Sequence, residues 1–160
     1  MVMKSAVGNY QPVPPSRIVT TDECLKVLTP DPILFTSCPQ EVETDTPFLA
    51  EASVRLRVKN VHEHKMVNCW TKARIRHTEK EEYTEWDWES EQESLTAGSE
   101  ITFQQRSLSR TLEYRKPGYP TAVAELLLFW EVEEEEEGQG SKLREEQLKF
   151  SDQCTIIVSD

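Results

Sequence analysis

The sequence is poor in the residues on which most catalytic and metal sites depend. Glycine occurs five times in 160 residues, and neither a G-x-S-x-G nucleophile motif nor a glycine-rich phosphate loop is present. The three histidines are His62, His64 and His77. Cys69 could join His62 and His64 in a zinc site. Zinc needs three or four ligands that converge on one point, and nothing in the spacing of these residues requires them to converge. We therefore expect no catalytic residue, no metal and no cofactor, and an enzyme is the less favoured class.

Long apolar runs and excess positive charge are also lacking. The longest apolar run, Leu126 to Trp130, is far shorter than the ~18 residues of a membrane span. With 29 acidic and 18 basic residues the chain carries a net charge of −11, which repels nucleic acid and anionic membranes. The start, MVMKSAVGNYQPVPPS, has no apolar core of a secretion signal. We expect a cytoplasmic protein, with leaderless secretion as the alternative, that binds neither nucleic acid nor membrane.

Closely spaced cysteine pairs are absent. Cys24, Cys38, Cys69 and Cys154 lie far apart, without a Cys-x-x-Cys motif. Their even number permits two disulfides, but a reducing compartment favours free, partly buried thiols. Free thiols are therefore the expectation.

What the sequence does contain is the two-residue alternation of half-buried strands. In FLAEASVRLRVKN, residues 48–60, small and apolar residues alternate with polar ones, and KMVNCWTKARIRH, residues 65–77, continues the pattern. The inward residues of the first segment are Ala52, Val54, Leu56 and Val58, and those of the second are Val67, Cys69, Thr71, Ala73 and Ile75. ILFTSCP, residues 33–39, is a further short strand that Pro39 ends.

The segment KARIRHTEKEEYTEWDWE, residues 72–89, predicts a hairpin. An antiparallel register whose paired residue numbers add to 161 gives the solvent-face pairs Lys72–Glu89, Arg74–Asp87 and Arg76–Glu85. The same register gives the core-face pairs Ala73–Trp88 and Ile75–Trp86. Opposite-charge and aromatic pairs each add about 0.2–1 kcal/mol, and a slip of one residue would bury the charges.

Like charges separate two other neighbouring strands. If residues 54–59 lay beside residues 72–76, the register that matches the core faces would set Arg and Lys opposite Arg and Lys, which destabilises a pair. We therefore expect these consecutive strands to lie in different sheets, as in a β-sandwich. The charged residues of the first strand, Arg55, Arg57 and Lys59, then lack an assigned acidic strand.

TAVAELLLFWEVE, residues 121–133, has the composition of a helix but the pattern of a strand. Pro120 could begin a helix, whereas even-numbered residues from Ala122 to Val132 make one apolar face and Phe-Trp-x-Val favours a strand. We predict a strand. Its other face carries Val123, Leu127 and Phe129, which are either covered or form a contact patch.

Two short motifs suggest an architecture. A Trp-bearing strand followed by LTAGSEITF and later by PGYPTAVAEL resembles immunoglobulin-like adhesion and fibronectin-type modules, over about residues 33–158. The antibody-type Cys…Trp…Cys spacing is not matched, because Cys69 directly precedes Trp70. We treat the resemblance as one of architecture: an all-β, antiparallel β-sandwich with an immunoglobulin-like layout of about seven or eight strands.

The chain is expected to divide at residue 30. Residues 1–29 predict a flexible arm, in which VTTDECLKVL permits one short helical turn capped by Thr21 or Asp22. Residues 30–160 predict a single domain with an acidic loop near residues 133–146.

The expected function is non-catalytic binding of another protein, with homo-oligomerisation as one form of it. The binding residues that we predict are Arg55, Arg57, Lys59, Val123, Leu127 and Phe129. The alternative is a barrel or cavity enzyme of the isomerase or cyclase kind, which would bind a small apolar ligand between Trp70, Trp86, Trp88 and Trp130.

Overall fold

The computed structural model describes residues 20–21, 24–77, 85–136 and 140–160, and this part of the chain consists of strands and loops. The first strands are β1 (Thr20–Thr21), β2 (Leu25–Val27), β3 (Ile33–Ser37), β4 (Glu41–Glu43), β5 (Phe48–Val54), β6 (Arg57–Asn60) and β7 (Val67–His77). The later ones are β8 (Trp88–Glu89), β9 (Glu93–Leu95), β10 (Glu100–Thr102), β11 (Arg106–Leu112), β12 (Thr121–Glu136), β13 (Gly140–Thr155) and β14 (Ile157–Ser159). Apart from the parallel pair β4–β14, the pairings in this part of the chain are antiparallel. The expected all-β, antiparallel class is confirmed.

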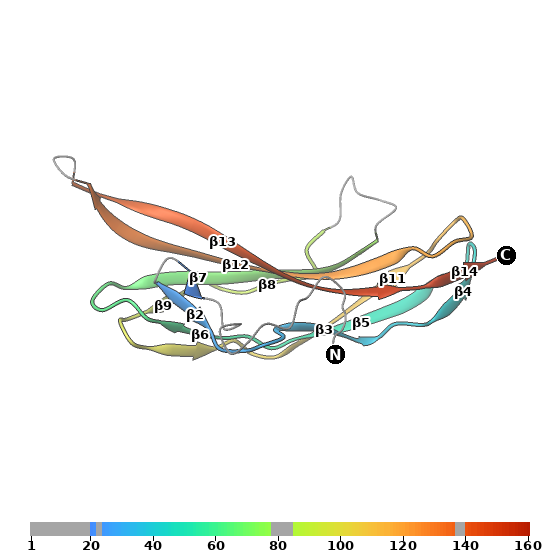
Figure 1. The fold of residues 1–160 in the computed structure, drawn as a ribbon, viewed down its shortest axis with the longest axis horizontal. Helices are drawn as coiled ribbons and strands as arrows, with labels where there is room; N and C mark the ends of the chain where they lie inside the picture. Colours follow the sequence, from blue (N-terminus) through green and yellow to red (C-terminus); the bar gives the residue numbers. More distant parts are fainter. Residues whose placement is uncertain (1–19, 22–23, 78–84, 137–139) are drawn as a thin grey trace.

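One layer is a long sheet in the order β13, β12, β7, β8, with β9 also paired to β7 (Figure 1). β7 alternates strictly between buried and half-buried residues, as its sequence predicts. The prediction that residues 121–133 form a strand is also confirmed, because β12 pairs with β7 on one side and β13 on the other. Two-sided pairing satisfies the backbone of β12, so its helix-favouring composition is overruled.

The opposite layer contains two short sheets, β11-β5-β3 and β1-β2-β6-β10. β5 is followed by β6 after a break of two residues, Arg55 and Leu56. The backbone N–H of Arg55 donates to Pro32 and that of Phe103 to the carbonyl of Leu56, so hydrogen bonds continue across the break. The prediction that residues 54–59 and β7 lie in different sheets is confirmed.

The core lies between these layers, which run along opposite sides of the molecule (Figure 1). Its largest fully buried apolar side chains are Tyr114, Leu25, Leu56, Ile75, Leu126, Leu128 and Ile156. The inward residues predicted for β5, β6 and β7 are buried. Full burial of a Leu or Ile side chain contributes about 1.5–3 kcal/mol, so this core is the main stabilising element.

The predicted 72–89 hairpin register is correct only at its end. Lys72 pairs with Glu89 and Ala73 with Trp88, but Asp87 does not lie beside Arg74. Its carboxylate accepts the N–H of Ile75 at 2.7 Å and the guanidinium of Arg110 in β11. The strand therefore leaves the regular ladder at Asp87, because that side chain stabilises a contact between the two layers. Residues 78–84, the predicted turn, lie outside the described residues.

Two predicted loops or turns are strands instead. Leu25–Val27 form β2 rather than a helical turn, because Leu25 and Val27 are buried and the strand pairs with β6. The acidic loop near 133–146 is mostly a hairpin extension, since β12 continues to Glu136 and β13 begins at Gly140. In this register Glu134 stands opposite Lys142. Most of the predicted flexible arm, residues 1–19 and 22–23, lies outside the described part.

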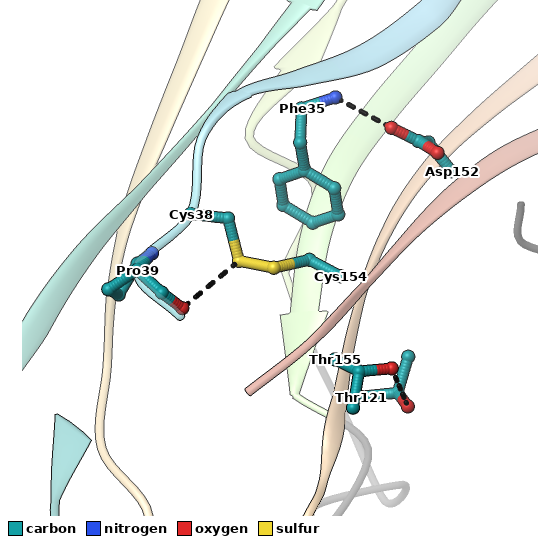
Figure 2. The surroundings of a disulfide bond; sticks show 7 residues. All are labelled: Phe35, Cys38, Pro39, Thr121, Asp152, Cys154 and Thr155. Atoms are coloured by element: carbon teal, nitrogen blue, oxygen red, sulfur yellow. Dashed lines mark hydrogen bonds between the residues drawn. A yellow bond between two sulfur atoms is a disulfide. The ribbon is translucent and has the colours of Figure 1, made fainter. Parts of the chain in front are cut away.

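A disulfide joins the two layers at one edge (Figure 2). Cys38, just after β3, is bonded to Cys154 in β13, with their Cα atoms 6.6 Å apart. Close by, the N–H of Phe35 in β3 donates to the Asp152 carboxylate at 2.9 Å. The expectation of free thiols is wrong for this pair in the structure, because the fold brings residues 116 positions apart into bonding range. Cys24 and Cys69 are buried and form no disulfide.

Candidate functional site

The outward side of the long sheet brings together basic and aromatic side chains from several strands. Even-numbered residues of β7 point outward, because its odd-numbered residues are buried in the core. The β7–β12 register sets Trp70, Lys72 and Arg74 opposite outward residues of β12, and the β12–β13 register adds Lys149. We call this surface the cationic–aromatic face. Its members are Trp70, Lys72, Arg74, Arg76, Trp86, Glu125, Leu127, Phe129 and Lys149.

Glu125 lies at the centre of the face and is only 2% exposed. Arg74 Nε and Arg76 Nε donate to its Oε1 at 2.8 and 2.9 Å, and Lys149 Nζ lies 2.7 Å from its Oε2. Burial raises the pKa of this carboxyl, but the hydrogen bonds and charges of these three cations outweigh burial and lower the pKa below its ordinary value. Glu125 is therefore a fixed anion that positions the cations, and it is unsuited to proton donation.

The aromatic rings of the face alternate with cations. Trp70 and Phe129 stack with their centroids 5.5 Å apart and their planes 9° from parallel. Lys72 Nζ lies 5.6 Å from the Phe129 ring and 5.9 Å from the Trp86 ring. Arg74 Cζ lies 4.2 Å from the centre of Trp86. Such cation–π contacts add about 0.5–1 kcal/mol at partly exposed sites, so the rings hold the cationic groups in place.

The face carries more positive than negative charge. Lys72, Arg74, Arg76 and Lys149 are neutralised in part by Glu125 and, through a 3.9 Å contact with Lys72, by an exposed Glu89. Within this cluster four cations thus meet two carboxylates, on a chain whose net charge is −11. Glu131 and Glu145 lie on the same outward side of the sheet, beyond Phe129 and Gln147. The arrangement suits recognition of anionic groups. Its aromatic rings also offer apolar contact area.

The predicted apolar patch is only partly available. Leu127 and Phe129 are half-buried members of the cationic–aromatic face. Val123 points to the same side but is 5% exposed, so neighbouring side chains already cover it. The patch is therefore an apolar strip within a charged surface.

The predicted basic stripe lies in the opposite layer and is not brought together with this face. Arg57 Nε donates to Glu100 Oε1 at 2.8 Å, and Lys59 stands opposite Glu100 in the β6–β10 register. The acidic neighbour is thus Glu100, from a strand that the sequence had not assigned to the stripe. Arg55 is exposed and makes no ion pair within the described residues.

The four tryptophans do not gather around one cavity. Trp70 and Trp86 belong to the outward face, and the prediction that Trp86 meets Ile75 in the core is wrong because Trp86 packs on Arg74. Trp88 and Trp130 lie on the inner side, where Trp130 is 2% exposed. A full sheet separates the two pairs, so they cannot line a common pocket.

The side chains of His62 and His64 interact with groups of their own loop. His62 Nδ1 accepts the backbone N–H groups of His64 and Lys65, each at 3.2 Å, and the His62 and His64 rings meet edge to face. His77 stacks on Tyr114 with centroids 4.1 Å apart. Among the described residues no group of three or more His, Cys, Asp and Glu side chains is placed to hold a metal ion.

Cys24 and Cys69, the two cysteines outside the disulfide, are expected to be unreactive in the native protein. Burial, together with the nearby charge of Glu93, raises the pKa of Cys69 to about 12, and Cys24 is 2% exposed. A thiol-specific reagent should therefore label neither of them near neutral pH, since the thiolate is the reactive form. Unfolding without a reductant should release two thiols per chain, and unfolding with one should release four. Four thiols without a reductant would contradict the Cys38–Cys154 bond.

Sequence reasoning missed the contribution of Glu125 and Lys149 to the face. It assigned Arg74 and Arg76 to Asp87 and Glu85 across a hairpin, whereas both bind Glu125 from β12. A signal was present, because Glu125 interrupts the apolar and aromatic outward residues of β12 between Val123 and Phe129. A carboxylate at such a position needs a basic strand beside it.

Comparison with protein-family models, with curated proteins and with solved structures finds no match to this chain. In the described part, no helix is long and apolar enough to cross a membrane. Functional inference therefore rests on the geometry of the cationic–aromatic face.

Proposed function

We propose that this protein is a non-catalytic protein-interaction module that binds an acidic segment of another protein through the cationic–aromatic face. The observation that carries the proposal is the excess of cations on this face of a strongly acidic chain, held by Glu125 and by stacked aromatic rings. Residues that are already ordered lose little entropy on binding. The ordered side chains of the cationic–aromatic face therefore favour binding of a partner.

An immunoglobulin-like sandwich is the layout that we propose for the module. Support comes from treating each interrupted strand as one: β2 with β3, β5 with β6, and β10 with β11. These make one layer in which the composite β5/β6 strand is central, and β13, β12, β7 and β8/β9 make the other. Hydrogen bonds of Arg55 and Phe103 across the breaks favour this treatment.

The spacing of the cations suggests the form of the partner. Lys72, Arg74 and Arg76 occur at every second residue of β7, so successive side chains on this side are about 6.5–7 Å apart. An extended segment of the type Glu-x-Glu-x-Glu has the same spacing and the opposite charge. Aromatic or aliphatic residues of such a segment would contact Leu127 and Phe129.

The test is a titration with a blocked peptide of alternating Glu and Ser, and with a Gln-for-Glu version as the peptide control. Trp70 and Trp86 lie on the face, so their fluorescence reports occupancy. We expect the Glu peptide alone to bind. Raising the salt from 0.05 to 0.5 M should weaken binding, because screening shortens the range of exposed charges. Lys72→Glu should weaken binding by about tenfold or more, since attraction becomes repulsion.

Arg55→Glu is the matched control, because it makes the same charge reversal on an exposed residue in the opposite layer. It should leave binding unchanged. Loss of binding in Arg55→Glu but not in Lys72→Glu would move the site to the basic stripe and contradict the proposal. Equal binding of the Glu and Gln peptides would contradict it as well. Lys72 is not one of the three cations bound to Glu125, and thermal denaturation of Lys72→Glu beside the native protein separates an effect on binding from one on folding.

A further inference from the structure

The outer edge of β13 is the longest open strand edge in the described part of the chain. β13 forms its ladder with β12 alone, although it is as long as β12. From Asp152 onward β3 approaches this edge: the Asp152 carboxylate accepts the N–H of Phe35, and Cys154 is bonded to Cys38 (Figure 2). Before Asp152, the described residues offer no strand beyond β13. Unpaired N–H and C=O groups on such an edge are a template for another strand.

We propose that a second copy of this chain pairs with this edge, so that β13 and its symmetry mate form an antiparallel ladder over residues 143–151. Two copies that share one edge about a two-fold axis must run antiparallel. The pairing joins two long sheets into one. The pairing does not require the peptide binding proposed for the cationic–aromatic face, although Lys149 belongs to both surfaces.

The register follows from side-chain direction and charge. Residues directly opposite one another in an antiparallel pair share a face, so the numbers of paired residues must add to an even sum. A sum of 294 sets Glu145 of each copy opposite Lys149 of the other. A sum of 290 sets Glu145 opposite Glu145, and a sum of 298 sets Lys149 opposite Lys149. Sums of 292 and 296 place neither Glu145 nor Lys149 opposite a residue of opposite charge. Only 294 among these pairs Glu145 with Lys149, twice by symmetry. A sum of 290 also sets Arg144 opposite Glu146 but leaves Glu145 opposite itself, and 296 sets Arg144 opposite Asp152, whose carboxylate already accepts the N–H of Phe35.

The exposed residues of this stretch are available for the pairing. Glu145, Gln147 and Lys149 are exposed on the outward side, and Lys149 Nζ, 2.7 Å from Glu125, could contact the partner's carboxylate as well. On the inward side, Leu148 is partly buried against the core. In the proposed register Leu148 of one copy lies diagonally across from Leu148 of the other, close enough for an apolar contact. Pairing would also bring the two cationic–aromatic faces onto one continuous surface.

The alternative reading is that Glu145 and Lys149 guard the edge against association, as charges on edge strands often do. Mass measurement by light scattering after size exclusion, over a range of protein concentrations, separates the two. The proposal predicts a species of twice 18.5 kDa at high concentration. Protein that stays monomeric at every concentration up to about 1 mM would overturn the proposal, since a dissociation constant above that value is a very weak affinity.

Gln147 lies on the proposed two-fold axis, which gives a sharp test of the edge and of the register. Gln147→Lys would set like charges opposite each other and should raise the dissociation constant of the dimer at least tenfold. Thr155→Lys, an exposed position on the same strand outside the ladder, should have no effect. Gln147→Cys should form an intermolecular disulfide under mild oxidation, whereas Glu145→Cys should not, because its copy is four residues away along the strand. A dimer unaffected by Gln147→Lys, or cross-linked equally by both cysteines, would overturn the proposal.

Discussion

Removal of the Cys38–Cys154 disulfide is expected to lower the free energy of unfolding by about 3–5 kcal/mol. The bond closes a loop of 116 residues, and a cross-link over so long a loop removes much of the entropy of the unfolded chain. It also holds β3 against β13 where the two layers meet. The measurement is urea denaturation of the double variant Cys38→Ala, Cys154→Ala beside the native protein.

A reductant supplies the matched control for this prediction. It should reduce the stability of the native protein to that of the double variant and leave the double variant unchanged. A difference below about 1 kcal/mol between the native protein and the double variant would contradict the prediction. It would mean that the contact between Asp152 and Phe35, with the core beneath it, suffices to close this edge.

Glu125→Gln is expected to destabilise the protein by about 2–3 kcal/mol. Removing one partner of a buried ion cluster typically costs about 3–5 kcal/mol. The cost is reduced here because the side chains of Arg74, Arg76 and Lys149 are 24%, 25% and 54% exposed and remain partly hydrated. Thermal and urea denaturation near pH 7 measure it. Glu133→Gln, an exposed position on the same strand, is the control and should change stability by less than about 0.5 kcal/mol.

The effect of Glu125 should depend on pH with a defined sign. Because the pKa of Glu125 is lower in the folded protein than its ordinary value of 4.5, the carboxylate stabilises the fold above pH 4.5. That contribution is lost as the pH falls through the folded-state pKa. The native protein and Glu125→Gln should therefore converge in stability in acid. A difference that persists unchanged at pH 3 would contradict an ionised Glu125 as its source.

The strands that could be predicted are those whose residues alternate between apolar and polar along the sequence. β5, β6 and β7 show a strict two-residue alternation, and their inward residues are buried as expected. Like charges on residues 54–59 and 72–76 placed these strands in different sheets, because direct pairing would set Arg and Lys opposite one another. In each case local pattern and long-range packing favour the same structure.

The features that could not be predicted depend on contacts between distant segments. Asp87 leaves the hairpin ladder because Arg110, far along the chain, reaches its carboxylate. Cys38 and Cys154 meet only after both layers are assembled. The sequence set Lys72, Arg74 and Arg76 on one outward face but assigned them to acidic partners across the hairpin and predicted the basic binding residues elsewhere. Glu125 and Lys149 could not be assigned to them, since that requires knowing that β12 lies between β7 and β13.

The most direct test of the proposed binding face uses the side-chain indole N–H signals of the four tryptophans in a two-dimensional ¹⁵N–¹H spectrum. Trp70 and Trp86 lie on the cationic–aromatic face, and Trp88 and Trp130 lie on the core side of the same sheet. Addition of the Glu-Ser peptide should shift the indole signals of Trp70 and Trp86 and leave those of Trp88 and Trp130 in place. Shifts confined to Trp88 and Trp130, or no shift of any of the four, would contradict the account.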